Sequence, residues 1–532
     1  MQTSNINATE QSSDLDEYHR EMDQLRVTIE QQNEHIQTLQ HQLEWFKRQL
    51  FGEKSEKRDM EDNPYQHTIA ELLIDLPAVV RVPEEKQTIH YQRGVAKKNA
   101  LEGTPDDSGL RFDESVPVEE IKILAPELQG PNAQDYEVIG YKTTYRLGQR
   151  PGSQVILKYT RPVIKKKSTQ QITTTAAPAN VLDRSFADVS FLAGMILDKF
   201  LYHLPLYRQH QRLDLNGIKV ARSTLTNLTQ RSIALLVPIY QAQLENVLRS
   251  RVLAMDETPI KAGRKTKGKM NRAYFWPIYG EQDEVCFTFS LSRGMRHVLE
   301  QLGEFKGTLV TDGYGAYEQF CQKNMSLTHA QCWVHSRRYF EQAQEAEPEA
   351  SAIALAYIGR LYEHEEYIKD QGLDGQKKLE YRSKNSLCVV ESFFGWCYEQ
   401  QQRIDLVRSN PLSKALAYVM KRQQELKVYL SDPDVPMDTN HLERALRVIP
   451  MGRRNWLFAW TELGAEHVGV IQSLLVTCKL HGVNPYDYLV DVLQRVGTHP
   501  ASKIEELTPR VWKEKFAENP LRSDLQTVGK HF

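Results

Sequence analysis

The chain has 532 residues, which is too many for one hydrophobic core, so we expect several domains. Its 67 Lys and Arg nearly balance 69 Asp and Glu, and 40% of its residues are hydrophobic, as in soluble globular proteins. No apolar run approaches the roughly 18 residues of a membrane span, and no signal-peptide core is present. These features argue against an integral membrane or secreted protein and favour a cytoplasmic one. All six cysteines lie in the second half without a CxxC pair, which argues against a disulfide framework.

The N-terminal region, residues 1–58, is predicted to be a coiled coil with a basic end. Apolar residues recur at spacings of three and four for five heptads, with Gln32 as the one polar exception. Such a helix would join copies of the chain into a homodimer or higher oligomer. The alternative is an amphipathic helix folded back on its own protein. Residues 59–114 have mixed polarity and are interpreted as a linker.

Residues 115–182 are predicted to form a small basic module of antiparallel strands, because YEVIGYKTTYRL and SQVILKYTRPVI alternate in polarity. Eight Lys or Arg and no acid occur between Val138 and Leu182. A solvated face is the usual explanation of a charge run, but so long a stretch without acids favours contact with DNA phosphates. The DNA-binding candidates here are Lys165, Lys166 and Lys167.

Residues 183–250 are predicted to be helical, with a turn at Asn216-Gly217 between two helices. A helix-turn-helix DNA-binding region has this shape, and so does an ordinary helical hairpin. Arg222, near the start of the second helix, is the candidate for DNA contact.

Residues 251–344 have the element order of a ribonuclease H-like α/β sheet: three apolar strands, a helix, a strand, a helix and a strand. Asp256 is expected in the first strand and Asp312 at the exit of the fourth, on neighbouring strands. Two carboxylates this close repel unless a cation lies between them, so a metal site is expected. Residues 256 and 257 of a strand would point to opposite faces, which favours Asp256 over Glu257 as the ligand.

A third acid, Glu443, is predicted on a helix within residues 437–456 and would complete a two-metal site. Each acid alone has a simpler explanation: a turn residue, a solvated strand end, or a salt-bridged helix face. Their order along these elements supports the metal site. The basic residues around them are the further candidates for DNA contact: Arg264, Lys265, Lys267, Arg337, Arg338, Arg444, Arg447, Arg453 and Arg454.

Eight strings occur in order along the chain: RQLFGEKSEK, HLPLYRQ, MDETPI, TDGYGAY, CWVHSRR, TNHLERALR, GRRNWLFA and KLHGVNPYDYLVDVL. From about residue 43 to about residue 515 the chain thereby resembles the transposases of the insertion-sequence-sixty-six family, whose catalytic core is of the DDE type. The resemblance implies that Asp256, Asp312 and Glu443 are catalytic acids that hold two Mg²⁺ ions, with Mn²⁺ as a substitute. It also implies a helical insertion at 345–437, a second part of the core at 438–470, and a C-terminal helical segment at 471–532.

The implied activity is that of a bacterial insertion-sequence transposase, which binds element ends, cleaves DNA and joins 3′-hydroxyl ends to target DNA. The implied partners are double-stranded DNA, as element ends and target, and accessory proteins of the same element. The alternatives are a catalytically inactive or domesticated transposase that only binds DNA, and a metal nuclease of the same fold.

The chain departs from the family where other members commonly carry a cysteine-rich zinc module. APELQG (125–130) occupies the position of a CPxCG-like string, and no thiolate is available there, so no zinc is expected. Cys332 and His335 could supply half of another zinc site. The absence of a second pair with ligand spacing favours structural support of the catalytic sheet instead.

Overall fold

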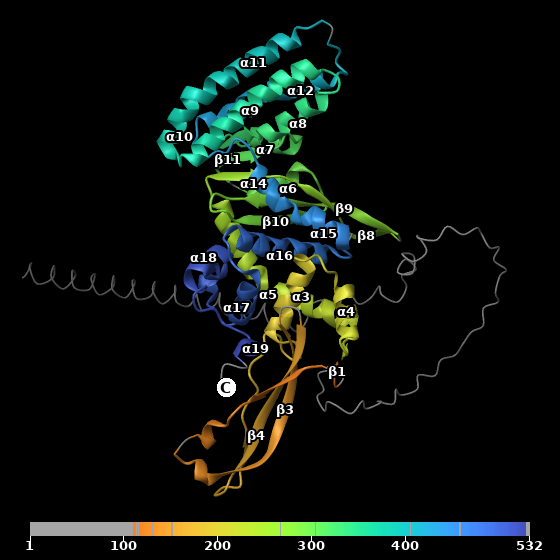
Figure 1. The fold of residues 1–532 in the computed structure, drawn as a ribbon, viewed down its shortest axis with the longest axis vertical. Coiled ribbons are helices and arrows are strands. Elements are labelled where there is room, and N and C mark those ends of the chain that lie inside the picture. Colours follow the sequence, from red (N-terminus) through yellow and green to blue (C-terminus); the bar gives the residue numbers. More distant parts are fainter. Residues whose placement is uncertain are drawn as a thin grey trace, which may run out of the picture. The chain divides into compact units, whose positions relative to one another are not determined.

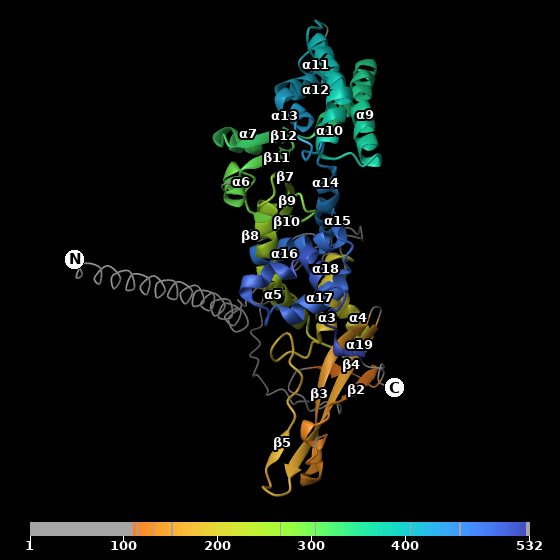
Figure 2. The same cartoon turned by 90° about the vertical axis from the view of Figure 1, so that its left-hand side faces the viewer.

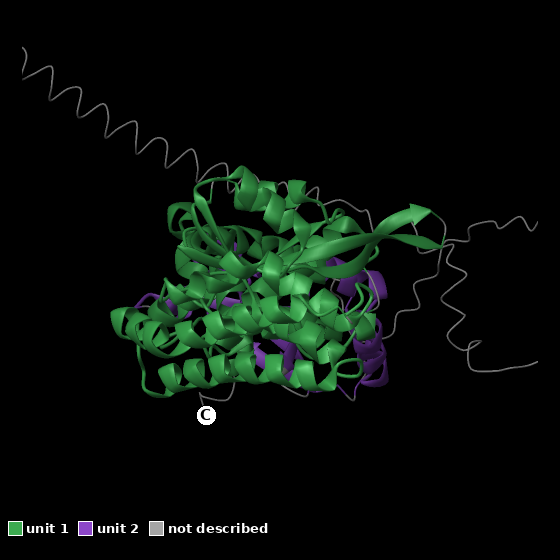
Figure 3. Ribbon diagram, turned by 90° about the horizontal axis from the view of Figure 1, so that it is seen from above, with its two compact units in different colours: residues 1–50, 192–205, 229–532 green, residues 51–191, 206–228 purple. Residues whose placement is uncertain are grey.

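The computed structural model describes residues 110–527, apart from residues 113, 115, 130, 151–152, 267, 304, 405 and 457–458. The predicted coiled coil and most of the linker lie outside the described residues. The described chain mixes helices and strands and divides into two compact units, coloured separately in Figure 3. Unit 1 contains residues 192–205 and the described residues from 229 onward, and unit 2 contains the described residues up to 191 together with 206–228. A multidomain α+β architecture is therefore confirmed.

Unit 2 is built on a long hairpin of two strands, β3 (Tyr136–Arg150) and β4 (Ser153–Lys166). The other edge of β4 pairs with β2 (Val118–Lys122) and β5 (Ile172–Thr174). β2 runs parallel to β4, so the prediction of a purely antiparallel module is wrong for this strand. The chain reverses once between β2 and β3 and again between β3 and β4, which leaves β2 and β4 in the same direction. Alternation of polarity predicts strands but not their direction.

The predicted turn at Asn216-Gly217 is confirmed, because Gly217 has a φ of +80° between α4 (Leu206–Leu215) and the short strand β6 (Ile218–Lys219). β6 pairs with β1 (Arg111–Phe112) before the 27-residue helix α5 (Arg222–Leu248) begins. A strand therefore separates the two helices, and DNA binding by this pair stays a prediction.

Unit 1 contains a central sheet in the order β10-β9-β7-β11-β12. β7, β11 and β12 are parallel, whereas β9 is antiparallel to β7 and β10 is antiparallel to β9; β8 pairs with β9 alone. The strands are β7 (Val252–Met255), β8 (Thr258–Thr266), β9 (Lys269–Tyr279), β10 (Val285–Ser290), β11 (Gly307–Thr311) and β12 (Leu327–Gln331). The expected first strand is thus interrupted at Asp256-Glu257 and continues as β8.

The helices of unit 1 cover this sheet or follow it along the chain. Two of them, α3 and α5, begin within the residues of unit 2. They are α3 (Val189–Phe200), α5, α6 (Met295–Leu302), α7 (Gly315–Lys323), α8 (Trp333–Ala343), α9 (Pro348–Asp370), α10 (Gly375–Tyr381), α11 (Leu387–Gln401), α12 (Pro411–Lys421), α13 (Gln423–Lys427), α14 (Asn440–Leu446), α15 (Val448–Trp456), α16 (Glu462–Leu480), α17 (Pro485–Arg495), α18 (Pro509–Lys515) and α19 (Asp524–Thr527). No helix within the described residues is both long and apolar enough to cross a membrane.

One face of the sheet packs against α5, α6 and α7 around buried residues such as Trp276, Leu309 and Tyr317. The edge strand β10 is covered by α16. The hydroxyl oxygens of Ser473 and Thr477 accept hydrogen bonds from the backbone N–H groups of Phe287 (2.8 Å) and Val285 (3.3 Å). This pairing satisfies donors that an open sheet edge would leave exposed.

Within the segment predicted as a helical insertion, residues 348–430 are helical and form α9 to α13 with short π and 3₁₀ turns. Its helices α9, α11 and α12 lie side by side in Figures 1 and 2. Trp333 at the start of α8 contacts Phe393 of α11 edge to face, at a ring-centre distance of 5.4 Å. The Trp333 indole N–H also donates to the Leu426 carbonyl at 2.9 Å, so the insertion is packed directly onto the helix that follows the sheet.

Candidate active site

Three carboxylates meet where β7 ends and β11 ends. Asp256, Glu257 and Asp312 each offer an oxygen, and these oxygens all lie within 4.8 Å of one another. β7 and β11 are parallel neighbours, so their C-terminal ends open at the same edge of the sheet. The sheet thereby brings together acids that are 56 residues apart in the chain.

The structure corrects the interpretation of Glu257. β7 stops at Met255 and β8 starts at Thr258, so residues 256 and 257 lie between strands and do not alternate across a sheet. The Glu257 side chain is 2% exposed and accepts hydrogen bonds from Arg293 (Nε, 2.9 Å) and from the Tyr317 hydroxyl (2.8 Å). Glu257 is therefore part of the cluster, contrary to the prediction from strand alternation.

Burial makes the cluster electrostatically unfavourable without a cation. Burial, followed by the charges of Asp312 and Glu257, raises the pKa of Asp256 to about 8. The pKa of Glu257 is also raised, by burial and by Asp312, although Arg293 and Tyr317 oppose the shift. Arg293 pairs with Glu257, but within the described residues no Lys or Arg pairs with Asp256 or Asp312.

Replacing Asp256 by Asn is expected to stabilise the metal-free protein at neutral and alkaline pH. The raised pKa means that the wild type loses stability as pH rises from about 4 to about 8, because the buried acid must ionise. Since one pKa unit corresponds to about 1.4 kcal/mol, the gain at pH 8 should be roughly 2–4 kcal/mol after allowance for coupling between the acids.

Thermal unfolding with EDTA at pH 5 and pH 8 measures this difference, and Mg²⁺ should stabilise the wild type more than the Asn variant. Asp370→Asn, at an exposed position at the end of α9, is the matched control and should change little at either pH. Equal stability of wild type and Asp256→Asn at pH 8 would show that the cluster is not under electrostatic strain.

Glu443 lies on α14, as predicted, but outside the group of three. Its carboxylate is 3.7 Å from the His335 Nε2 and 3.5 Å from an Arg338 guanidinium nitrogen. Its charge contributes to the raised pKa of Asp256 and, with that of Asp312, acts on His335. Burial is the main cause that lowers the pKa of His335, whose Nδ1 is buried without a hydrogen-bond partner. His335 therefore lies within the electrostatic reach of both acids.

The CWVH string anchors the segment that leads to Glu443. The Cys332 sulfur accepts hydrogen bonds from the backbone N–H and the hydroxyl of Thr439, both at 3.3 Å. The backbone N–H of Trp333 donates to the Met437 carbonyl at 3.2 Å. These contacts agree with the prediction of a supporting role for this string.

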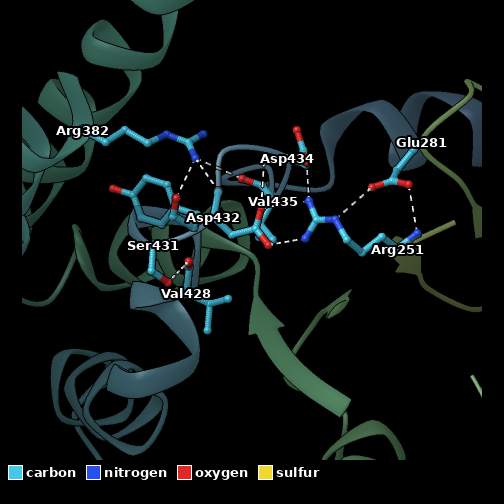
Figure 4. A network of polar contacts seen from close by, with 9 residues as sticks. Arg251, Glu281, Arg382, Val428, Ser431, Asp432, Asp434 and Val435 are labelled. Atoms are coloured by element: carbon cyan, nitrogen blue, oxygen red, sulfur yellow. Dashed lines mark hydrogen bonds and ion pairs between the residues drawn. The ribbon is translucent and has the colours of Figure 1, made fainter. Parts of the chain in front are cut away.

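Two arginines hold the preceding loop from opposite sides, as Figure 4 shows. Arg251, next to β7, binds the carboxylates of Asp432 (2.5 Å) and Asp434. Arg382 is fully buried and donates to the carbonyls of Tyr429 (2.6 Å), Asp432 (3.1 Å) and Val435 (3.2 Å). The loop is thus tied both to the sheet and to the insertion just before α14.

The insertion also contacts the turn that carries Asp312. The Asp312 carboxylate accepts a hydrogen bond from the Tyr314 N–H at 2.9 Å, and Arg422 donates to the Gly313 carbonyl at 3.0 Å. A Cβ at Gly313 would lie 2.5 Å from the Tyr418 hydroxyl, so only glycine allows this approach. Helix α12 and the residue after it therefore help to fix the position of Asp312.

The predicted DNA-binding residues fall into separate groups. Arg338 contacts Glu443, while Arg337 pairs with Glu341 on its own helix at 3.2 Å. Arg453 donates to the Pro259 carbonyl, next to the cluster. Arg444, Arg447 and Arg454 are exposed on α14 and α15 or between them, and Arg264 and Lys265 are exposed on β8. Lys267 lies outside the described residues; Lys165, Lys166, Lys167 and Arg222 belong to unit 2.

Sequence reasoning passed over Arg293 and Tyr317, which hold Glu257. Tyr317 closes the TDGYGAY string, which could have marked it, because it stands one helical turn after the glycine turn. Arg293 carries no comparable signal, since it lies in an ordinary polar segment after β10.

The donor set fits a hard divalent cation. Mg²⁺ is bound in proteins through carboxylate and other oxygen ligands, and a cation would relieve the repulsion that raises the pKa of Asp256. Asp256, Glu257 and Asp312 supply oxygens at one point, and Glu443 is close enough to interact with them through its charge.

Comparison with known proteins identifies the family. Residues 184–467, more than half of the chain, match the model described as "Transposase IS66 family". The chain belongs to the IS66 transposase family. Residues 473–510 match the IS66 C-terminal element, which corresponds to the end of α16, α17 and the start of α18. Transposases cleave and transfer DNA, so this IS66 protein belongs to a class of DNA-cutting enzymes that generally use divalent metals.

Relatives of this IS66 protein occur in Sinorhizobium fredii. It is 29% identical over 401 residues to the uncharacterized protein y4hP, covering 71% of this chain and 72% of the relative. It is 27% identical over 406 residues to the uncharacterized protein y4qI, covering 73% of this chain and 74% of that relative.

Proposed function

We propose that the chain is a DNA transposase of a bacterial insertion sequence that cleaves element ends and joins their 3′-hydroxyls to target DNA. The observation that carries this proposal is the partly buried cluster of Asp256, Glu257 and Asp312 at the C-terminal edge of the sheet, in a chain of a transposase family. The strand order β10-β9-β7-β11-β12, with three antiparallel strands followed by two parallel ones, supports a ribonuclease H-like catalytic core of the DDE type.

Asp256, Asp312 and Glu443 are the residues proposed to hold two Mg²⁺ ions, with Mn²⁺ as a substitute. Bound there, the ions would supply Lewis acidity and activate the attacking oxygen. Glu257 is proposed as a further member of this acidic group, held in place by Arg293 and Tyr317. Arg338 and Arg453 lie next to the acids and are proposed to bind the phosphates that flank the reacting one.

Each reaction step exchanges one phosphorus–oxygen bond for another. In cleavage, water attacks the phosphodiester at the element end and the 3′-oxygen leaves as a hydroxyl. In joining, that 3′-hydroxyl attacks a target phosphodiester and releases a target 3′-hydroxyl. His335, which contacts Glu443 and lies within the electrostatic reach of Asp312, is proposed to orient Glu443.

The proposed partners are double-stranded DNA, further copies of the chain through the N-terminal heptads, and accessory proteins of the same element. The proposed place of action is the bacterial cytoplasm, where chromosomal DNA is the target. Unit 2 is proposed to bind the element ends through Lys165, Lys166, Lys167 and Arg222.

The deciding experiment is a cleavage and joining assay on DNA that carries the inverted repeats flanking the gene. We expect strand cleavage and joining that require Mg²⁺ or Mn²⁺ and stop with EDTA. Specific binding without metal-dependent cleavage would instead support an inactive or domesticated DNA-binding protein. Cleavage of any duplex without joining would support a metal nuclease.

A further inference from the structure

A two-stranded ribbon leaves the sheet directly beside the acidic cluster. β8 begins at Thr258, immediately after Asp256 and Glu257, and β9 is the one described strand with which it pairs. The two strands are joined through Gly268, whose φ of +79° suits a tight hairpin turn. In Figure 1 the arrows labelled β8 and β9 extend past the other strands of the sheet.

The ribbon is fastened at its base and exposed beyond it. Backbone hydrogen bonds join Gly263 N–H to the Ala459 carbonyl (3.1 Å) and Ala459 N–H to the Lys261 carbonyl (2.9 Å). On β8, Ile260, Ala262 and Gly263 are buried, whereas residues 264–266 are exposed. On β9 the change from exposed to buried comes between Arg272 and Ala273. The outer part of β8, residues 264–266, is therefore open to solvent.

All charged side chains of the ribbon are positive. Residues 258–280 contain six Lys or Arg and no acid. Lys261 and Arg272 are direct cross-strand partners, and both are exposed. Two like charges directly opposite each other destabilise a strand pair, so their presence points to an anionic ligand.

A groove of about 740 Å³ runs along this part of the ribbon and has four cations in its wall. It is lined by Lys261, Lys265, Gly268, Lys269, Met270, Asn271, Arg272 and Leu291, with no carboxylate among them. Lysines also protect exposed strand edges against pairing with other chains. Edge protection does not require charges of one sign over the whole ribbon, nor two cations directly opposite each other.

We propose that the β8–β9 ribbon binds the DNA duplex that flanks the cleaved phosphodiester, with Lys261, Lys265, Lys269 and Arg272 contacting its phosphates. This inference rests on the proposed function, because the acids define the point of cleavage. A two-stranded ribbon fits the major groove of B-DNA. Eight residue steps from Thr258 to Thr266 span about 26 Å, or about eight base pairs of duplex.

The test compares two full-length variants with equal loss of charge. In the ribbon variant Lys261, Lys265, Lys269 and Arg272 become Ala. In the control Lys377, Lys384, Lys414 and Arg408 become Ala, all exposed on the helical insertion. Binding to a 40-base-pair duplex of unrelated sequence is measured by fluorescence anisotropy over a range of salt concentrations.

We expect the ribbon variant to bind at least about tenfold more weakly at 0.15 M salt, and the control to bind like the wild type. The slope of log K against log salt should become shallower by about three to four, since each phosphate contact contributes about 0.9. A photo-crosslinking residue in place of Thr266 should react with DNA within about ten base pairs of the cleaved position, given the span of the ribbon.

Unchanged affinity and unchanged salt slope in the ribbon variant would overturn the inference. Unchanged DNA affinity together with a change in oligomeric state, measured by light scattering, would also overturn it and show that the ribbon is a protein interface. Failure of the proposed function is distinguishable, because it appears as absence of metal-dependent cleavage by the wild type. A loss of duplex affinity in the ribbon variant would still support contact between ribbon and DNA in that case.

Discussion

Replacement of Asp256 or Asp312 by Asn, or of Glu443 by Gln, is expected to lower DNA cleavage and joining by about 10³-fold or more for each variant. The physical reason is that each change removes a carboxylate charge from the acidic group. Asp256, Glu257 and Asp312 converge at one point, and the negative charge of Glu443 acts on Asp256. Binding of the element ends should stay within about threefold of the wild type, since DNA affinity comes mainly from basic side chains.

The measurement is single-turnover cleavage with Mg²⁺, alongside an affinity measurement with EDTA. Glu300→Gln, on the exposed side of α6, is the matched control and should cleave like the wild type. Glu257→Gln tests Glu257 separately from Asp256, Asp312 and Glu443, because the Glu257 carboxylate already has Arg293 and Tyr317 as partners. A variant of Asp256, Asp312 or Glu443 that joins DNA at the normal rate would remove that residue from the catalytic group.

Replacement of Arg382 by Ala is expected to lower the free energy of unfolding by roughly 3–5 kcal/mol, which is typical when one partner of a buried ion pair is removed. Arg382 is 0% exposed and binds both Glu365 carboxylate oxygens, at 2.8 and 2.7 Å. It also donates to the backbone carbonyl of Tyr429 and to two backbone carbonyls of the loop before α14. Truncation would leave the partly buried carboxylate and these carbonyls without this partner.

Denaturant unfolding of the purified chain measures this loss. Arg296→Ala removes an exposed arginine whose partner, Glu300, lies one helical turn away, and should cost less than about 0.5 kcal/mol. A change below 1 kcal/mol for Arg382→Ala would show that the loop before Glu443 does not depend on this arginine.

Much of the core could be predicted from the sequence because its elements are locally encoded. Alternating polarity marked the strands, and apolar spacing marked the helices of 345–437 and the helix of Glu443. Asp312 was correctly placed at the exit of a strand, because an apolar run ends there in a glycine-containing turn. The family strings determined the family, which the match over residues 184–467 confirms.

The role of Glu257 could not be predicted in this way. The polarity pattern of RVLAMDETPIKA shows no break that would divide it into two strands. In the structure, however, β9 pairs with β7 at Met255 and with β8 at Thr258, which leaves the two acids between the strands. Where a strand breaks depends on pairing with a partner that comes later in the chain. Local alternation cannot report this, and the same limit applies to the parallel direction of β2.

The opening balance of charge carried less information than its distribution. A net charge of −2 conceals the acid-free run 258–280, which the sequence alone marks as a candidate for phosphate binding. Sequence by itself thus determined the family, the strands and helices, and two of the acids at the cluster. Three features became visible only in the tertiary structure. Glu257 joins the other acids, and Arg251 and Arg382 bind the loop that leads to Glu443. The basic run projects as a ribbon beside the acids. The physical reason is that local pattern encodes elements, whereas convergence of side chains depends on strand pairing and long-range packing.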